Sequence, residues 1–157
     1  MTIEKIAIGS DHAGFDLKEN LKQFLSGKGY ALADVGPASH DSVDYPDYAE
    51  SVSIRVARGD ADLGVLVCGT GLGMTITANK IQGIRAALLY DAFAAHYAKA
   101  HNDANVVIFG GRTISPEDAR KYLGIFLKEK FEGGRHKKRL DKIAKIESRI
   151  TRVNGGR

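Results

Sequence analysis

The sequence predicts an α/β fold of three layers, in which a parallel sheet of five strands has helices on both faces and a further helix follows at the C-terminus. Short apolar runs alternate along the chain with longer segments whose apolar residues recur at helical spacing. The run Leu63–Val67 is almost entirely apolar, which is typical of a strand buried on both faces of a parallel sheet. The 157 residues suffice for one hydrophobic core, so we expect a single domain over 1–150 and a flexible basic tail over 151–157.

The expected strands and helices follow one another in alternation. The strands are expected at Lys5–Gly9, Tyr30–Val35, Leu63–Val67, Ile84–Leu89 and Asn105–Phe109. The helices between and after them are expected at about Gly14–Ser26, Pro46–Ala57, Met74–Lys80, Ala92–Ala100 and a segment that starts at Ser115.

The ends of these helices have local causes. Gly27 and Gly59 end two of them, and Pro46 is favoured in the first turn of another. Ser115, followed by a proline and two acidic residues, is the strongest helix start in the chain. Apolar residues then recur from Leu140 to Ile150 with lysines and arginines around them, which predicts an amphipathic C-terminal helix that packs on a partner subunit or a neighbouring helix.

Composition excludes several classes of protein. A single cysteine rules out an internal disulfide framework and a Cys-rich zinc site. The first eight residues mix acidic and basic side chains, unlike a signal peptide, and no apolar run is long enough to cross a bilayer. We therefore expect a cytoplasmic protein that does not bind membranes.

The net charge of +4 is concentrated near the C-terminus. From Lys128 to Arg157 the chain has eleven Lys and Arg against four Asp and Glu, which raises the alternative of RNA binding. This basic segment lacks interleaved aromatic residues, and no nucleic-acid-binding motif occurs elsewhere, so we expect no nucleic-acid partner.

The segment Cys68-Gly69-Thr70-Gly71-Leu72-Gly73 follows the third expected strand. Glycines at this spacing allow successive backbone N–H groups to converge on a negative charge, and the start of a helix favours the thiolate form of a cysteine. We interpret the segment as a base or nucleophile beside an anion pocket. The alternative is a buried cysteine followed by a packing turn.

Polar side chains also follow the other strands, and ligands of open parallel sheets bind outside the carboxyl ends of the strands. The candidates are Asp11, His12, Tyr90, Asp91 and Arg112, together with His101, Asn102 and Asp103 at the end of the helix before the last strand. We expect all of them on one rim of the sheet. Each also has a plainer interpretation, such as a helix cap for Asp11 or a turn for Asn102.

These residue types suit two kinds of chemistry. A cysteine with a histidine suits a hydrolase, whereas Cys68 as a base beside amides that hold an enediolate suits a proton-transfer enzyme. The basic cluster Arg135–Arg139, with Arg112, suits a phosphate ester. There is no Walker A lysine motif, and the histidine spacing matches no zinc pattern. The residues alone leave both enzyme types open.

Seven motifs in order resemble the type B ribose-5-phosphate isomerases, a family shared with galactose-6-phosphate and allose-6-phosphate isomerases. They are Gly9-Ser10-Asp11-His12-Ala13-Gly14, Asp44-Tyr45-Pro46, Cys68-Gly69-Thr70-Gly71, Ala78-Asn79-Lys80, Gly83-Ile84-Arg85-Ala86, His101-Asn102-Asp103 and Glu132-Gly133-Gly134-Arg135-His136. The resemblance extends from about Ile6 to Ile146, and it departs at Ser10, where many relatives carry cysteine, and after Ile150.

The resemblance implies a Rossmann-like fold, a homodimer or tetramer with its active site between subunits, and an aldose–ketose isomerisation through a cis-enediolate without metal or other cofactor. By this resemblance Cys68 is the base, Thr70 exchanges protons between the sugar oxygens, and backbone amides of Gly69, Gly71 and Gly73 form the anion hole. The resemblance further assigns ring opening to Asp11 and His101, sugar contacts to Tyr45 and Asn102, and phosphate binding to His12, Arg112, Arg135 and Arg139.

We therefore expect the interconversion of ribose 5-phosphate and ribulose 5-phosphate, a step of the non-oxidative pentose phosphate pathway. An imidazole at position 101 crowds a sixth carbon, which favours a pentose over allose 6-phosphate or galactose 6-phosphate. A non-catalytic sugar-phosphate-binding protein on the same fold is the alternative from another class.

Overall fold

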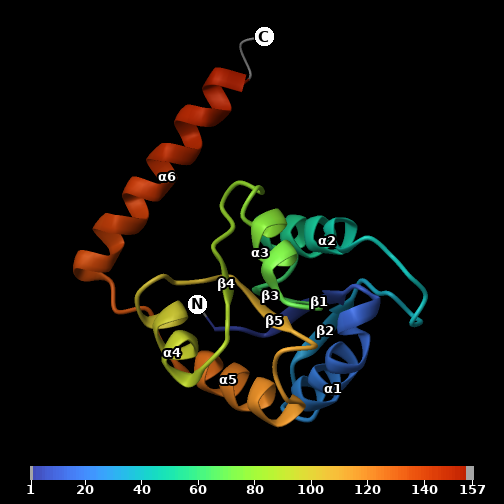
Figure 1. The fold of residues 1–157 in the computed structure, drawn as a ribbon. Coiled ribbons are helices and arrows are strands. Elements are labelled where there is room, and N and C mark those ends of the chain that lie inside the picture. The colour runs from blue at the N-terminus through green and yellow to red at the C-terminus, as the bar shows by residue number, and fades with distance from the viewer. Residues whose placement is uncertain (1, 155–157) are drawn as a thin grey trace.

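The five strands form one parallel sheet in the order β2-β1-β3-β5-β4 in the computed structural model, which describes residues 2–154 (Figure 1). The strands are β1 (Lys5–Ser10), β2 (Ala31–Asp34), β3 (Leu63–Cys68), β4 (Ala86–Leu88) and β5 (Val106–Gly110). The helices are η1 (His12–Gly14), α1 (Phe15–Ser26), α2 (Tyr45–Ala57), α3 (Leu72–Ala78), α4 (Ala92–Ala100), α5 (Pro116–Lys128) and α6 (Gly134–Asn154). The predicted three-layer α/β class is confirmed.

Two hydrophobic clusters hold the layers together, one on each face of the sheet. On one face Leu21 of α1, Ala95 of α4 and Phe126 of α5 pack against the strands. On the other face Val52 of α2 and Met74 of α3 do the same. The centre of the sheet is the part most shielded from solvent, because every residue of β3 and β5 is buried. The strand that ends in Cys68 is therefore held on both faces and both edges.

Several boundaries differ from the expected ones by a few residues. Only Ala86–Leu88 of the expected strand Ile84–Leu89 pair with β5, at the edge of the sheet. The helix after β3 begins at Leu72 instead of Met74, because Gly71 takes a positive φ of 79° and turns the chain directly into the helix. The first helix is preceded by the 3-10 turn η1, which Asp11 caps.

Helix α6 projects away from the rest of the molecule (Figure 1). Its side chains Ile143 and Ile146 are about half exposed, at 47% and 48%. The carboxylate of Glu147 accepts the backbone N–H of Gly83, at 3.3 and 3.2 Å from its two oxygens. The backbone of the helix continues to Asn154, and residues 155–157 lie outside the described residues, so the tail predicted over 151–157 stays a prediction, as does the domain boundary at 150.

None of the helices in residues 2–154 combines the length and the apolar character needed to cross a bilayer.

Candidate active site

Cys68 lies at the carboxyl end of β3 with its side chain buried. The backbone N–H of Gly71 donates to Sγ of Cys68 at 3.2 Å, so the turn that follows the strand folds back onto the sulfur. The carbonyl of Cys68 accepts the N–H of Gly111 at 2.7 Å, which ties the end of β3 to the end of β5. A fixed donor directed at the sulfur stabilises negative charge there.

The glycines of the loop after Cys68 have no space for side chains. A Cβ on Gly71 would lie 2.4 Å from Cδ1 of Leu88, in a backbone conformation with φ of 79° that L residues rarely adopt. A Cβ on Gly73 would lie 2.6 Å from Cζ of Tyr45, so the tyrosine ring covers the start of α3. Thr70 is exposed, and its Oγ1 accepts the N–H of Leu72 at 3.3 Å. The loop presents backbone and one hydroxyl beside the thiol.

Asp11 and His12 follow the neighbouring strand, β1. Asp11 is 7% exposed, and its Oδ1 accepts the N–H of Gly14 at 2.9 Å, while its own N–H donates to the carbonyl of Val67. It therefore caps η1 and also lies at the end of β3. Nδ1 of His12 accepts the N–H of Val43 at 3.3 Å, which leaves Nε2 of the neutral ring as an N–H donor.

Arg112 closes this part of the site from the end of β5. Its backbone N–H donates to the carbonyl of Gly69 at 2.9 Å. Its side-chain Nη1 lies 3.6 Å from the position that a Cβ on Gly69 would occupy. The structure thus brings Asp11, the loop after Cys68 and Arg112 together at the carboxyl edge of the sheet. The expected common rim is confirmed for these residues.

The common rim is wrong for His101, Asn102 and Asp103. These residues follow α4 and precede β5, whose amino end pairs with the amino end of β3 through the N–H of Gly64 and the carbonyl of Asn105. Cys68 pairs with Gly110 at the other end of the same strand. Five strand residues span about 16 Å. A helix between parallel strands returns the chain to the amino edge, so its last residues lie at the edge opposite Cys68.

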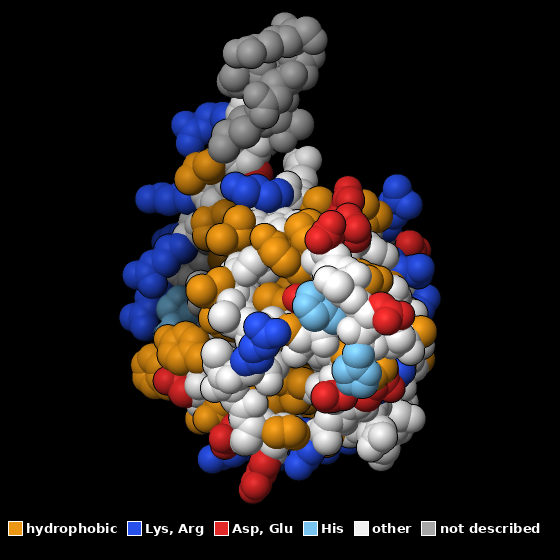
Figure 2. All heavy atoms as spheres, turned by 45° about the vertical axis from the view of Figure 1, so that its right-hand side comes forward, with side chains coloured by type: hydrophobic (Ala, Val, Ile, Leu, Met, Phe, Trp, Pro, Cys, Tyr) orange, Lys and Arg blue, Asp and Glu red, His pale blue; other side chains and the backbone are white. Residues whose placement is uncertain are grey.

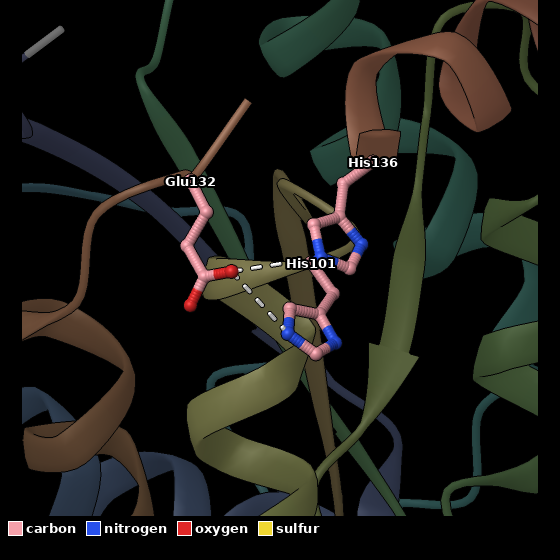
Figure 3. Close-up of side chains that lie close together, drawn as sticks. All are labelled: His101, Glu132 and His136. Atoms are coloured by element: carbon pink, nitrogen blue, oxygen red, sulfur yellow. Dashed lines mark ion pairs between the residues drawn. The ribbon is translucent and has the colours of Figure 1, made fainter. Parts of the chain in front are cut away.

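His101 belongs to a second cluster, which Figure 3 shows with Glu132 and His136. The imidazole rings of His101 and His136 are stacked, with centroids 3.8 Å apart and planes 12° from parallel. Oε2 of Glu132 lies 3.5 Å from Nε2 of each ring. The N–H of Glu132 donates to the carbonyl of Ala100 at 3.0 Å, which fixes the chain between α5 and α6 against the end of α4.

The basic residues of this cluster lie at the start of α6. Nε of Arg135 donates to Nε2 of His136 at 3.3 Å. Burial lowers the pKa of His136, and the electrostatic effect of His101 and the positive charges of Arg135 and Arg139 lower this pKa further, against the opposing effect of Glu132. Asn102 is exposed next to His101, and its carbonyl accepts Nε of Arg85 at 3.1 Å.

The ligand atoms of His101, Glu132 and His136 lie within 4.8 Å of one another, close enough to be tested as a metal site. The lone pair of Nε2 of His136 faces the guanidinium of Arg135, which is always positively charged. A cation would have to displace this arginine beside a further arginine at position 139. The charges of the cluster fit an anion better than a metal ion.

The sequence indicates Arg135 and Arg139 as phosphate ligands within the basic cluster Arg135–Arg139, but it gives no role to Glu132 and no separate role to His136. Both belong to the motif Glu132-Gly133-Gly134-Arg135-His136, where a spacing of four residues leaves the two side chains close together. The missing information was the contact with His101, which lies on a different element and is brought to His136 only by the tertiary structure.

The fold and the loop after Cys68 define a Rossmann-like α/β protein with a buried thiol beside an exposed backbone loop. Residues 6–143 match the model of the Ribose/Galactose Isomerase family, and the chain belongs to this family. It is 42% identical over 147 residues to ribose-5-phosphate isomerase B of Escherichia coli (strain K12), covering 94% of this chain and 99% of that protein.

Solved structures show the same similarity. A ribose 5-phosphate isomerase of Thermotoga maritima is 49% identical, with a TM-score of 0.89 over 90% of this chain and 98% of that one. Ribose-5-phosphate isomerase B of Mycoplasma genitalium, solved with bound ribulose-5-phosphate, is 39% identical, with a TM-score of 0.89 over 94% of this chain and 99% of that one.

Proposed function

We propose that the protein interconverts ribose 5-phosphate and ribulose 5-phosphate through a cis-enediolate, without metal or other cofactor. The observation that carries the proposal is the buried thiol of Cys68, with the N–H of Gly71 on its sulfur and a glycine loop next to it. The relative from Escherichia coli that is named a ribose-5-phosphate isomerase B, and the one from Mycoplasma genitalium that holds ribulose-5-phosphate, support a pentose phosphate as substrate.

In this proposal Cys68 moves a proton between C2 and C1 of the open-chain sugar. The enediolate then carries negative charge on O1 and O2, which the backbone amides of Gly69, Gly71 and Gly73 hold; each such donor is worth about 3–4 kcal/mol of transition-state stabilisation. Thr70 exchanges protons between O1 and O2. Its Oγ1 accepts from Leu72, so its hydroxyl proton is directed elsewhere and is available to the sugar.

The phosphate group is held by a histidine and three arginines in the same proposal. His12 offers its Nε2–H, and Arg112 offers its guanidinium at the carboxyl edge of the sheet. Arg135 and Arg139 offer theirs at the start of α6. Contacts with a phosphate far from C1 and C2 supply binding energy that positions the reacting carbons against the thiol.

Ring opening by Asp11 and His101 requires two copies of the chain, because these residues lie at opposite edges of the sheet. The same holds for the sugar contacts of Tyr45 and Asn102. We therefore propose a homodimer, or a tetramer built from such dimers, in which each site combines the carboxyl edge of one copy with the His101 cluster of the other.

Exposed apolar side chains support this association. On α3, Leu72 and Ile76 are 60% and 63% exposed, and at the start of α4 Phe93 is 71% exposed. The exposed isoleucines of α6 extend the set. In Figure 2 hydrophobic side chains gather on the body of the molecule beneath the projecting helix. Surfaces of this kind mark protein interfaces.

The cytoplasm is the proposed location, because catalysis by the lone cysteine needs a reduced thiol. The second candidate reaction is the same isomerisation of galactose 6-phosphate or allose 6-phosphate. The family name, Ribose/Galactose Isomerase, supports galactose 6-phosphate as an alternative substrate.

The test is an isomerase assay on purified protein in the presence of a metal chelator. We expect turnover of ribose 5-phosphate, with a higher kcat/KM than for either hexose phosphate, and a fall of about 10³-fold in Cys68→Ala. Ser53→Ala is a matched control, because Ser53 is equally buried and its hydroxyl has no hydrogen-bond partner in the described part of the chain.

Normal turnover by Cys68→Ala would contradict the role of Cys68 as base. Binding of all three sugar phosphates without turnover would contradict the enzyme assignment and favour a sugar-phosphate-binding protein.

A further inference from the structure

Glu132 contacts two stacked histidines through a single carboxylate oxygen (Figure 3). We infer that Glu132 is a positioning residue that fixes His101 in one tautomer, with its proton on Nε2 and its lone pair on Nδ1. The catalytic consequence of this inference rests on the proposed function, whereas the tautomer itself does not.

Arg135 determines which nitrogen of His136 carries the proton. Nε of Arg135 donates to Nε2 of His136 at 3.3 Å, and an arginine has donors only. Nε2 of His136 must therefore be an acceptor, and the proton of the neutral ring is on Nδ1. The lowered pKa of His136, which burial causes, keeps this ring neutral near pH 7. His136 thus presents a lone pair at Nε2 and supplies no proton to Glu132.

Glu132 determines which nitrogen of His101 carries the proton. Its Nε2 faces the same carboxylate oxygen at 3.5 Å, and a carboxylate only accepts. At Nε2 of His136 the donor and positive charge of Arg135 offset the carboxylate, but among the described residues no arginine donates to Nε2 of His101. A bare Nε2 of His101 would therefore place its lone pair against an uncompensated negative charge, so the electrostatics select the tautomer with hydrogen on Nε2. Nδ1 is then the only acceptor atom of the His101 ring.

The carboxylate and the ring are both held in place. The N–H of Glu132 is bonded to the carbonyl of Ala100, the residue before His101, so the two side chains share an anchor. The ring of His101 is stacked on His136 and also contacts the ring of Tyr97, with centroids 4.2 Å apart. Rotation of His101 away from Glu132 would break both ring contacts.

The tautomer decides what His101 can do. Opening a furanose removes the proton of O1, breaks the bond between C1 and O4, and adds a proton to O4. A bare Nδ1 accepts the proton from O1 and returns it to O4, so the step balances without a further reactant. Asp11 of the other copy then takes part in ring opening as a hydrogen-bond acceptor for the sugar and does not carry the proton. The negative charge of Glu132 stabilises the imidazolium that exists between these two transfers.

The tautomer is measured directly by long-range ¹H–¹⁵N spectra of the histidine rings in the full-length protein, with His101 assigned by its loss in His101→Asn. We expect a protonated Nε2 and a bare Nδ1 in the wild type, and a mixture of both tautomers in Glu132→Ala. Glu129→Ala is the matched control, because Glu129 pairs with Nδ1 of His96 at 3.0 Å and leaves the His101 signals unchanged. A proton on Nδ1 in the wild type, or an unchanged tautomer in Glu132→Ala, would overturn the inference.

The catalytic consequence is tested by the dependence of rate on enzyme concentration with ribose 5-phosphate. An enzyme that opens the ring gives a rate proportional to its concentration. In Glu132→Ala we expect a fall of roughly ten- to a hundredfold, and a plateau at the uncatalysed rate of ring opening as enzyme is added. Glu129→Ala should keep the wild-type line.

A lower rate that stays proportional to enzyme would indicate a merely structural role and contradict the assignment to ring opening. A wild-type protein inactive on every sugar phosphate would contradict the proposed function instead, and the ring spectra would then decide the tautomer alone.

Discussion

The two edges of the sheet differ in how they are built. At the carboxyl edge the thiol is buried, the turns are made of glycines packed against neighbouring atoms, and the polar contacts are mostly with backbone groups. At the amino edge the functional groups are side chains from the end of α4 and the start of α6, stacked on one another and partly exposed. The groups at the carboxyl edge belong to the strands and their turns, whereas those at the amino edge come from the ends of helices.

This difference separates two tasks of the proposed reaction. Proton transfer between carbons needs a base and an anion hole in fixed positions, which the buried end of β3 provides. In the proposed reaction, ring opening and phosphate binding need side chains that reach the ligand, and to these tasks the amino edge contributes His101 and the two arginines at the start of α6. Because the edges are about 16 Å apart in one chain, the residues of the proposed site are divided between the two regions, and the proposed reaction requires two copies of the chain to associate.

The packing of the carboxyl edge is disrupted most directly by a substitution at Gly14. A Cβ there would lie 2.5 Å from the carbonyl oxygen of Val67, so Gly14→Ala must push η1 away from β3 and displace Asp11, which caps the N–H of Gly14. We expect a loss of about 2 kcal/mol in the free energy of unfolding, measured in urea, and at least about a tenfold loss of isomerase activity.

Gly124 is the matched control for this prediction. It lies inside α5, where a new Cβ would meet only Cζ of Phe24, at 3.8 Å. Gly124→Ala should therefore stabilise the protein by about 1 kcal/mol through helix propensity. Wild-type stability in Gly14→Ala would show that the carboxyl edge is not as tightly packed as the structure indicates.

The cluster of His101, Glu132 and His136 at the amino edge is expected to have a smaller effect on the free energy of unfolding, and this effect depends on pH. Burial and neighbouring positive charges lower the pKa of His136 in the folded protein below the value of 6.5 that applies when the chain is unfolded. The unfolded state therefore binds the proton more readily, and the contribution of His136 to stability is complete above pH 6.5 and is lost as the pH falls below it.

We expect the urea concentration at the midpoint of unfolding to decrease when the pH is lowered from about 7.5 to about 5. This decrease should be smaller in His136→Asn. His96→Asn serves as control, because His96 is paired with Glu129 at the surface. An equal pH dependence in wild type and His136→Asn would contradict the assignment of this effect to His136.

Local sequence patterns are enough to predict the elements and to place Asp11, the loop after Cys68 and Arg112 at one edge of the sheet. Glycine turns, helix caps and apolar runs depend on neighbouring residues, so the five strands, their helices and the loop after Cys68 were all predicted. The expected strand Ile84–Leu89 was too long because pairing at a sheet edge, here with β5, is a tertiary property.

The other half of the site depends on direction and contact, which sequence patterns do not contain. The sequence analysis places His101, at the end of the helix before the last strand, on the same rim as Cys68, but a helix between parallel strands ends at the amino edge. The stacking of His101 on His136 and the shared contact with Glu132 join segments about 30 residues apart, so no local pattern predicts them.

In the site that we propose, Cys68 comes from one copy of the chain and His101 from another. Coexpression of Cys68→Ala and His101→Asn chains with two different affinity tags allows hybrid dimers to be purified by both tags in turn. Each hybrid then contains one site with both residues intact and one with neither. We predict about half the activity of the wild-type dimer, although each variant alone is almost inactive. Hybrids no more active than the two variants alone would contradict the claim.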